Sequence, residues 1–175
     1  MNLYDYQQTV VEQVEGKIAA GVRRIIVAAP TGSGKTVIGS EIIKRAVAEY
    51  RWRVLFIAHR DELLTQARNK LARFDITAGI IKAGRDKDAR PQAMVQIAGI
   101  QTLHARALRY RTMELPPAEV VIVDEAHHAR ARTYEQIVAA YPQRHHYRTN
   151  SNAVQNRWAG IRKYLRCDYR GTASR

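Results

Sequence analysis

The feature that most constrains the fold of this chain is a glycine-containing segment, APTGSGKT, at residues 29–36. It follows an apolar run of strand length at residues 24–29 and precedes a segment with helical periodicity at residues 35–50. A strand, a tight glycine loop and a helix in this order form the context of a phosphate-binding loop. The general pattern begins with Gly, and in this chain that position is Ala29.

We expect this loop to bind the phosphates of a nucleotide. Backbone N–H groups turned inward at its glycines, together with the positive end of the helix, can hold phosphate oxygens. Lys35 is expected to reach the β- and γ-phosphates, and the Thr36 hydroxyl is expected to ligate Mg²⁺. The full set expected to bind the nucleotide is Thr31, Gly32, Ser33, Gly34, Lys35 and Thr36. The alternative is a glycine-rich turn with an incidental lysine.

Strand-like and helical segments alternate along most of the chain. Helical periodicity is expected at residues 6–20, 35–50, 61–74, 101–108 and 133–141. Apolar strand-length runs are expected at 24–29, 54–58 and 119–123, with weaker strand signals at 78–81 and 93–98. This alternation predicts an α/β fold with a mostly parallel sheet that is flanked by helices on both faces.

A second polar motif, DEAHH, follows the apolar run 120–123. Its carboxylates are therefore expected at the carboxyl edge of the sheet, where open α/β folds bind their ligands. Asp124 is expected to hold Mg²⁺ through water, and Glu125 to orient and deprotonate an attacking water, so that Lys35, Asp124 and Glu125 form the catalytic set. Helix capping is the alternative. A zinc site at His127 and His128 is disfavoured because no second ligand cluster accompanies them.

Together, APTGSGKT and DEAHH resemble the first RecA-like domain of superfamily 2 helicases, the DEAD/DEAH group. LYDYQ at residues 3–7 resembles an element whose glutamine contacts adenine, which implies that role for Gln7. AHRDEL at 58–63 resembles motif Ia, and IQTL at 100–103 resembles a later element that contacts the nucleic-acid backbone. The resemblance covers residues 3–143 and implies nucleic-acid contacts by His59, Arg60, Gln101 and Thr102. The residues of the AHRDEL and DEAHH motifs resemble those of DNA-directed restriction or repair members more than those of RNA helicases.

Each implied role has an ordinary structural alternative. Gln7 is also compatible with the surface of a helix, His59 and Arg60 with a solvated helix start, and Gln101 and Thr102 with a helix cap. One group of basic residues is expected to form a solvated loop in preference to a specific DNA contact: Lys82, Arg85, Lys87 and Arg90.

Charge and hydropathy restrict the partners of the chain. The formal net charge is +13, from 29 Lys and Arg against 16 Asp and Glu, which suits either a nucleic-acid partner or a solvated basic surface. The resemblance of the motifs implies DNA in preference to RNA. No apolar run is long enough to cross a bilayer, and the N-terminus lacks the features of a signal peptide. Cys167 is the single cysteine and cannot form an internal disulfide. A cytoplasmic protein without a membrane partner is therefore expected.

The resemblance stops at about residue 143. The helicase pattern requires one more buried strand ending in a motif such as GLTATP and then a second RecA-like domain, but residues 143–154 are QRHHYRTNSNAV. As a hypothesis, a one-nucleotide slip in the reading frame near Gln143 explains this. Codons for His145, His146 and Tyr147 encode only Ile or Thr when read one base later, and those for residues 148–154 can then encode GLTATP. DNA sequencing across codon 143 tests the hypothesis.

Under this hypothesis the chain divides into a helicase ATP-binding domain at residues 1–143 and an aberrant basic tail at 144–175. The tail holds 8 of the 29 basic residues and 1 acidic residue, and it is expected to be disordered. The sheet is then expected to lack one central strand. The resemblance also implies a second RecA-like domain, which is expected to come from another chain or to be absent.

Three functions are compatible with these expectations. The first is the ATP-binding motor domain of an ATP-dependent DNA helicase or translocase, with ATP and Mg²⁺ as cofactors and little activity in isolation. The second is a non-catalytic ATP- or DNA-binding remnant of such an enzyme. The third, a small kinase or switch protein, is disfavoured because it leaves DEAHH and AHRDEL without a role.

Overall fold

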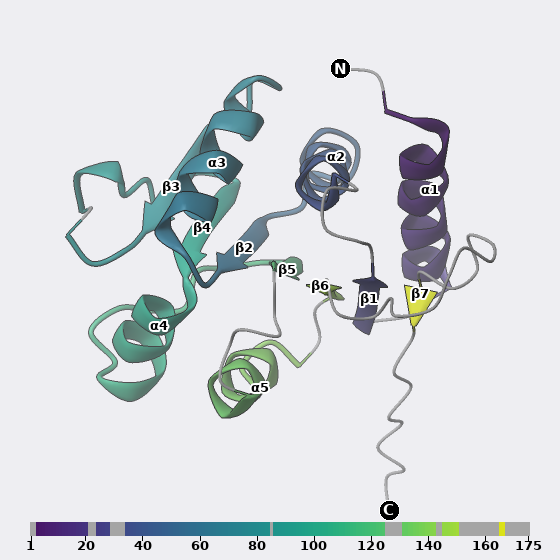
Figure 1. Cartoon of the computed structure of the whole chain (residues 1–175). Coiled ribbons are helices and arrows are strands. Elements are labelled where there is room, and N and C mark those ends of the chain that lie inside the picture. Colours follow the sequence, from purple (N-terminus) through teal and green to yellow (C-terminus); the bar gives the residue numbers. More distant parts are fainter. Residues whose placement is uncertain are drawn as a thin grey trace, which may run out of the picture.

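The computed structural model describes residues 3–20, 24–28, 34–84, 86–124, 131–142, 145–150 and 165–166 (Figure 1). The helices are α1 (Asp5–Ala19), α2 (Lys35–Ala48), α3 (Asp61–Ala72), α4 (Ile100–Leu103) and α5 (Ala131–Ala139). The strands are β1 (Arg24–Ala28), β2 (Val54–Ala58), β3 (Ala78–Ile81), β4 (Val95–Gly99), β5 (Val120–Val123), β6 (His145–Asn150) and β7 (Leu165–Arg166). A π-helical segment, His104–Arg109, continues directly from α4.

The strands form one seven-stranded sheet in the order β3-β4-β2-β5-β6-β1-β7. Every pairing from β3 to β1 is parallel, and only β7 runs antiparallel to its neighbour. Helices α1, α2 and α3 lie on one face of the sheet, and α4 and α5 lie on the other (Figure 1). The predicted α/β class, with a mostly parallel sheet between helices, is therefore confirmed.

The core has two halves, one on each face of the sheet. Every residue of β2 is buried, and its side chains divide between the two halves by alternation, as a pleated strand requires. Val54, Phe56 and Ala58 pack with α1, α2 and α3, whereas Leu55 and Ile57 pack with α4 and α5. This two-sided burial explains why the central strands are continuous apolar runs in the sequence.

Helices α1 and α2 are joined by a polar network centred on Arg45. Its guanidinium contacts Glu15 on α1 at 2.9 Å and Glu41 on α2 at 3.3 Å, and it donates a hydrogen bond to the side chain of Gln8 at 3.3 Å. Burial opposes the charged form, but Glu41 and Glu15 outweigh it, so the pKa of Arg45 is raised. The network lies beside the apolar packing of Val10, Val11 and Val14 with α2, and α1 so packed brings the N-terminal segment to the start of α2.

The structure corrects one expectation about the sheet. Residues 145–150 were expected to leave a gap, but they form β6, which pairs with β5 on one side and with β1 on the other. Tyr147 lies in register with Ile25 of β1 and Ile122 of β5. Between two strands that both offer open backbone N–H and C=O groups, a segment of little apolar character can still pair, because the ladder is made by the main chain.

The remaining part of the expected tail is not described by the structure, apart from β7. The predicted disorder of residues 151–164 and 167–175 therefore falls outside the described residues. Within the described part of the chain, no helix combines the length and apolar character that a membrane crossing demands.

The central position of β6 gives a testable consequence. A Tyr147→Pro substitution removes a backbone N–H from a strand that is paired on both sides, and it leaves the facing carbonyl unsatisfied. We expect the free energy of unfolding to fall by about 1–3 kcal/mol, measured by urea denaturation. Tyr147→Val is the control, since valine keeps the N–H and favours strands. Equal stability of both variants would show that these residues do not form a sheet strand.

Candidate functional site

Most of the residues singled out by sequence come together at the carboxyl edge of the parallel sheet. Asp124 directly follows β5, His59 and Arg60 follow β2, and Gln101 and Thr102 follow β4 within α4. Helix α2 begins at Lys35, after the loop that leaves β1. Residues 29–33, which include Thr31, Gly32 and Ser33, and residues 125–130, which include Glu125 and the histidine pair, lie outside the described residues.

The N-terminus of α2 is well suited to an anion. Gly34 is its N-cap, with a left-handed backbone (φ +76°), and as a glycine it has no side chain of its own to cap the helix. The Gly34 carbonyl accepts hydrogen bonds from the N–H groups of Val37 and Ile38 at 2.7 and 3.0 Å. Lys35 and Thr36 form the first helical turn and are both partly buried. The partial positive charge of the helix end is thus directed toward the loop region.

Gln7 lies directly against this helix start. Its side chain is only 4% exposed, and a Cβ atom at Gly34 would overlap its Nε2 atom. The Oε1 atom accepts a hydrogen bond from the backbone N–H of Tyr4 at 3.1 Å, and Nε2 donates to the Tyr6 hydroxyl at 3.2 Å. Gln7 is therefore a buried neighbour of the predicted phosphate loop, and the alternative of a surface position is wrong.

Two tyrosines beside Gln7 were not singled out by sequence. Tyr4 is 71% exposed and Tyr6 is 40% exposed, and their rings stack with centroids 6.0 Å apart and an interplanar angle of 7°. The two rings therefore present an aromatic face to solvent beside Gln7, and a planar ligand can stack on such a face. The signal in the sequence is the spacing YxYQ, which places both rings next to the glutamine.

Asp124 is the buried carboxylate of the site. It is 6% exposed, and its backbone N–H donates to the carbonyl of Ile57 at 2.9 Å, which extends the β2–β5 ladder by one residue. A single strand, β6, separates β5 from β1, so the ends of β5 and β1 lie about 10 Å apart. Carboxylate and hydroxyl oxygens are ligands that Mg²⁺ prefers, so Asp124 and Thr36 fit such an ion. The pKa of Lys70 on α3 is lowered, because burial outweighs the opposing attraction of the Asp124 carboxylate.

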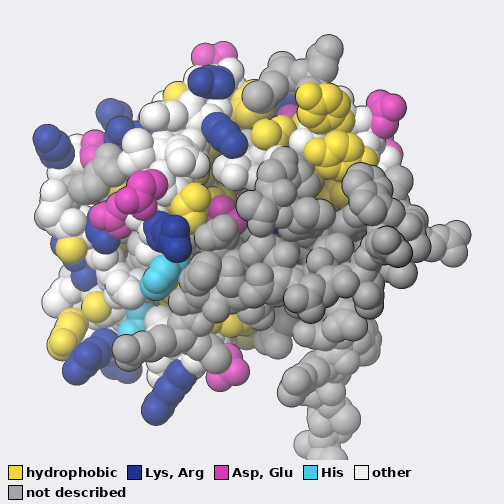
Figure 2. Space-filling model, in the orientation of Figure 1, with side chains coloured by type: hydrophobic (Ala, Val, Ile, Leu, Met, Phe, Trp, Pro, Cys, Tyr) yellow, Lys and Arg dark blue, Asp and Glu magenta, His cyan; other side chains and the backbone are white. Residues whose placement is uncertain are grey.

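The second group of residues lies on neighbouring strands β2 and β4 at the same edge. Arg60 is exposed and has an extended backbone where α3 begins, while His59 is partly buried. Gln101 is exposed, whereas Thr102 is 9% exposed. Figure 2 shows Lys and Arg side chains spread over the half of the molecule that holds β3, β4, α3 and α4, with acidic side chains among them.

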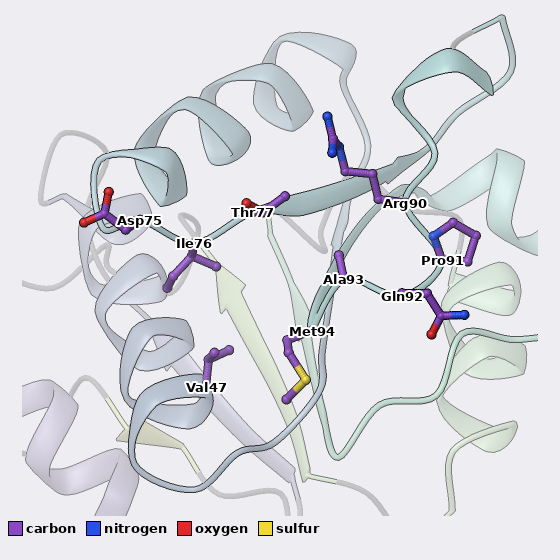
Figure 3. Close-up of a pocket in the computed structure, with 9 residues that line it drawn as sticks. All are labelled: Val47, Asp75, Ile76, Thr77, Arg90, Pro91, Gln92, Ala93 and Met94. Atoms are coloured by element: carbon purple, nitrogen blue, oxygen red, sulfur yellow. The ribbon is translucent and has the colours of Figure 1, made fainter.

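A cavity of about 590 Å³ opens at the opposite, amino-terminal edge of the sheet (Figure 3). Met94 immediately precedes β4 and Thr77 immediately precedes β3, while Val47 contributes from the last turn of α2. The cavity is lined by Val47, Asp75, Ile76, Thr77, Arg90, Pro91, Gln92, Ala93 and Met94. It contains none of the residues predicted for nucleotide or nucleic-acid binding, so the described cavity is separate from the candidate site.

Comparison with known proteins identifies relatives for most of the chain. The model of the family described as "Type III restriction enzyme, res subunit" matches residues 1–150. The putative ATP-dependent helicase IRC3 of Saccharomyces cerevisiae is 33% identical over 144 residues, which are 78% of this chain and 20% of that protein. The endonuclease subunit of the type I restriction enzyme EcoKI of Escherichia coli is 29% identical, over 78% of this chain and 12% of its own length. This chain thus spans a fifth or less of these two relatives.

Solved structures share the fold. The UvsW helicase of bacteriophage T4 superposes with a TM-score of 0.69 at 19% identity, over 87% of this chain and 54% of that chain. The SWI2/SNF2 ATPase core of Sulfolobus solfataricus, solved with double-stranded DNA, gives 0.67 at 19% identity, over 90% and 33%. The matched region is the RecA-like domain of these proteins.

The contact between Gln7 and Gly34 predicts the effect of adding one methyl group. Gly34→Ala places a Cβ where Gln7 Nε2 lies and forces a left-handed backbone on alanine, so we expect a loss of at least about 1–2 kcal/mol in stability. Thermal unfolding measures it. Gly39→Ala is the control in the same helix, because no atom of the described residues lies within 4 Å of its Cβ position, and a gain of about 0.5–1 kcal/mol is expected there. Equal effects of the two substitutions would contradict the described contact.

Proposed function

Because this chain belongs to the family of the type III restriction enzyme res subunit and is homologous to ATP-dependent helicases, we propose that it is the ATP-binding motor domain of a DNA helicase or translocase. The observation that carries the proposal is the position of Gln7. It is buried against the left-handed N-cap Gly34, at the same sheet edge as Asp124. An adenine recognised by the N-terminal segment and a phosphate tail bound at α2 would therefore belong to one ligand, ATP.

The residues divide the binding of ATP between base and phosphates. Gln7 and the stacked rings of Tyr4 and Tyr6 offer hydrogen-bonding groups and an aromatic face to the adenine. The loop residues Thr31, Gly32, Ser33 and Gly34, with the start of α2, are proposed to hold the phosphates. Lys35 adds a positive charge at the β- and γ-phosphates.

Hydrolysis requires groups at the opposite side of the phosphate tail. Thr36 and Asp124 are proposed to hold Mg²⁺, which supplies charge neutralisation on the phosphate oxygens when bound. Glu125, which follows Asp124, is proposed to orient the attacking water and accept its proton. Asp124 is buried at the edge of the sheet, so few water molecules compete with a metal ion for its carboxylate.

A non-catalytic nucleotide- or DNA-binding role is the second candidate. The chain matches 20% of the length of IRC3, so groups that the remainder of such a protein contributes to catalysis lie outside the matched residues. In superfamily 2 helicases the second RecA-like domain supplies arginines that stabilise charge in the transition state, and such an arginine contributes about 10³- to 10⁵-fold in rate. ATP binding without significant turnover is the expected behaviour of the chain by itself.

Substitution of Lys35 tests the nucleotide site. Lys35→Ala removes a charge-assisted hydrogen bond to phosphate, worth about 1.5–3 kcal/mol, so the Kd for a fluorescent Mg·ATP analogue should rise about 10- to 100-fold. Lys44→Ala, on the same helix but paired with Glu41 at 3.4 Å, is the control and should bind normally. A Kd unaffected by the loss of Lys35 would refute the nucleotide site.

ATP hydrolysis with and without single-stranded DNA separates the two candidate functions. DNA-stimulated turnover that disappears in Lys35→Ala supports an active motor domain. Nucleotide binding in the absence of turnover supports the non-catalytic role.

The nucleic-acid contacts are proposed to be with the backbone, through His59, Arg60, Gln101 and Thr102. Arg60→Gln should weaken binding of single-stranded DNA of any sequence and reduce the slope of log K against log salt by about 0.7, the value for one phosphate contact. Fluorescence anisotropy over a salt series measures both quantities. An unchanged slope, or an effect confined to one sequence, would argue against a backbone contact by Arg60.

A further inference from the structure

Lys82 belongs to a polar stretch of the sequence, but in the structure it lies at the carboxyl edge of the sheet. It directly follows β3, and β3, β4 and β2 are neighbouring parallel strands. The ends of these strands therefore bring Lys82 to the same edge as Arg60, which follows β2, and Gln101, which follows β4. Lys82, which the sequence places in an expected solvated loop, thus lies beside the residues proposed for nucleic-acid binding.

The side chain of Lys82 is held across the end of β4. A Cβ at Gly99 would lie 3.4 Å from Cδ of Lys82 and 3.7 Å from Oγ1 of Thr102, so the lysine stem passes over this glycine beside Thr102. Its Nζ atom lies 2.7 Å from Oδ1 of Asp61, in the first turn of α3. The Lys82 side chain is 25% exposed and that of Asp61 is 58% exposed.

This ion pair places a cation beside the proposed nucleic-acid residues and offsets its charge. Asp61 is mostly in water, and ion pairs between solvent-exposed side chains contribute little to stability. A nucleic-acid strand carries closely spaced phosphates, which exchange their condensed counterions for protein cations with a gain in entropy. A phosphate can therefore replace Asp61 as the partner of Lys82 at small cost.

We propose that Lys82 is a phosphate-binding residue of the nucleic-acid site and that Asp61 acts as its displaceable counterion, which restrains affinity until a strand is bound. This inference rests on the proposed nucleic-acid function and adds to it a residue and a control on affinity. Asp61 lowers the affinity of the site for any polyanion, so weakly bound strands are released. Only a strand that also contacts Arg60 and Gln101 displaces Asp61 from Lys82.

Opposite substitutions of the two partners test the proposal by fluorescence anisotropy with single-stranded DNA. Lys82→Gln should weaken binding about threefold or more and reduce the salt slope by about 0.7, whereas Lys82→Arg should keep both values near wild type. Asp61→Asn should strengthen binding at low salt by about twofold or more, because Lys82 no longer has a competing carboxylate. Lys44→Gln removes a lysine of a similar ion pair on α2 and should change neither value.

The outcomes are distinct. If wild type does not bind DNA, the proposed function fails. If wild type binds and Arg60→Gln weakens it, but Lys82→Gln behaves as wild type, the function stands and this inference is overturned. If Asp61→Asn and Lys82→Gln both weaken binding, the pair is a structural tether, and the inference is again overturned.

The rate of lysine acetylation in the wild-type chain, with and without DNA, provides a test that does not depend on whether the variants fold. Added DNA should protect Lys82 and leave Lys44 unchanged, as measured by mass spectrometry. Modification of Lys82 that DNA does not slow would overturn the inference.

Discussion

Parallel pairing of the strands from β3 to β1 is the constraint on which the rest of this structure depends. Parallel strands point the same way, so the segments that follow β2, β4 and β5, and the start of α2 after β1, all meet at one edge of the sheet. Each strand must also be covered on both faces, which explains the division of the core between α1, α2 and α3 on one side and α4 and α5 on the other.

The position of α1 completes the nucleotide side of this edge. Helix α1 precedes the first strand, so the sheet alone does not place it at the start of α2. Val10, Val11 and Val14 of α1 do so by packing into the half of the core that also holds the buried residues of α2. The contacts of Arg45 with Glu15 and Glu41 lie beside this packing, and Gln7 lies against Gly34. A residue 27 positions before the N-cap in sequence becomes its direct neighbour, because α1 packs against α2.

Sequence patterns identified apolar strands, including one with a weak signal, and missed the features that depend on neighbouring segments. The strands at residues 54–58 and 78–81 were predicted with the bounds that the structure has, because short continuous apolar runs are typical of buried strands. The helix predicted at 101–108 is instead α4 followed by a π-helical segment, a difference of hydrogen-bond register that apolar spacing does not encode. β6 was expected to be absent, because its residues lack the apolar character of a core strand, whereas the backbone of its neighbours provides the pairing.

The sequence by itself determined the fold class, the family and the identities of the residues at the candidate site. These features follow from residue types at fixed positions relative to the strands: glycines, a lysine and carboxylates have the same chemistry however the helices pack. Tertiary structure alone decided which distant residues are neighbours. It buried Gln7 against Gly34, exposed the stacked pair Tyr4 and Tyr6, and set Lys82 against Asp61. Such contacts arise from the order of strands in the sheet and from helix packing, which local patterns in a chain do not specify.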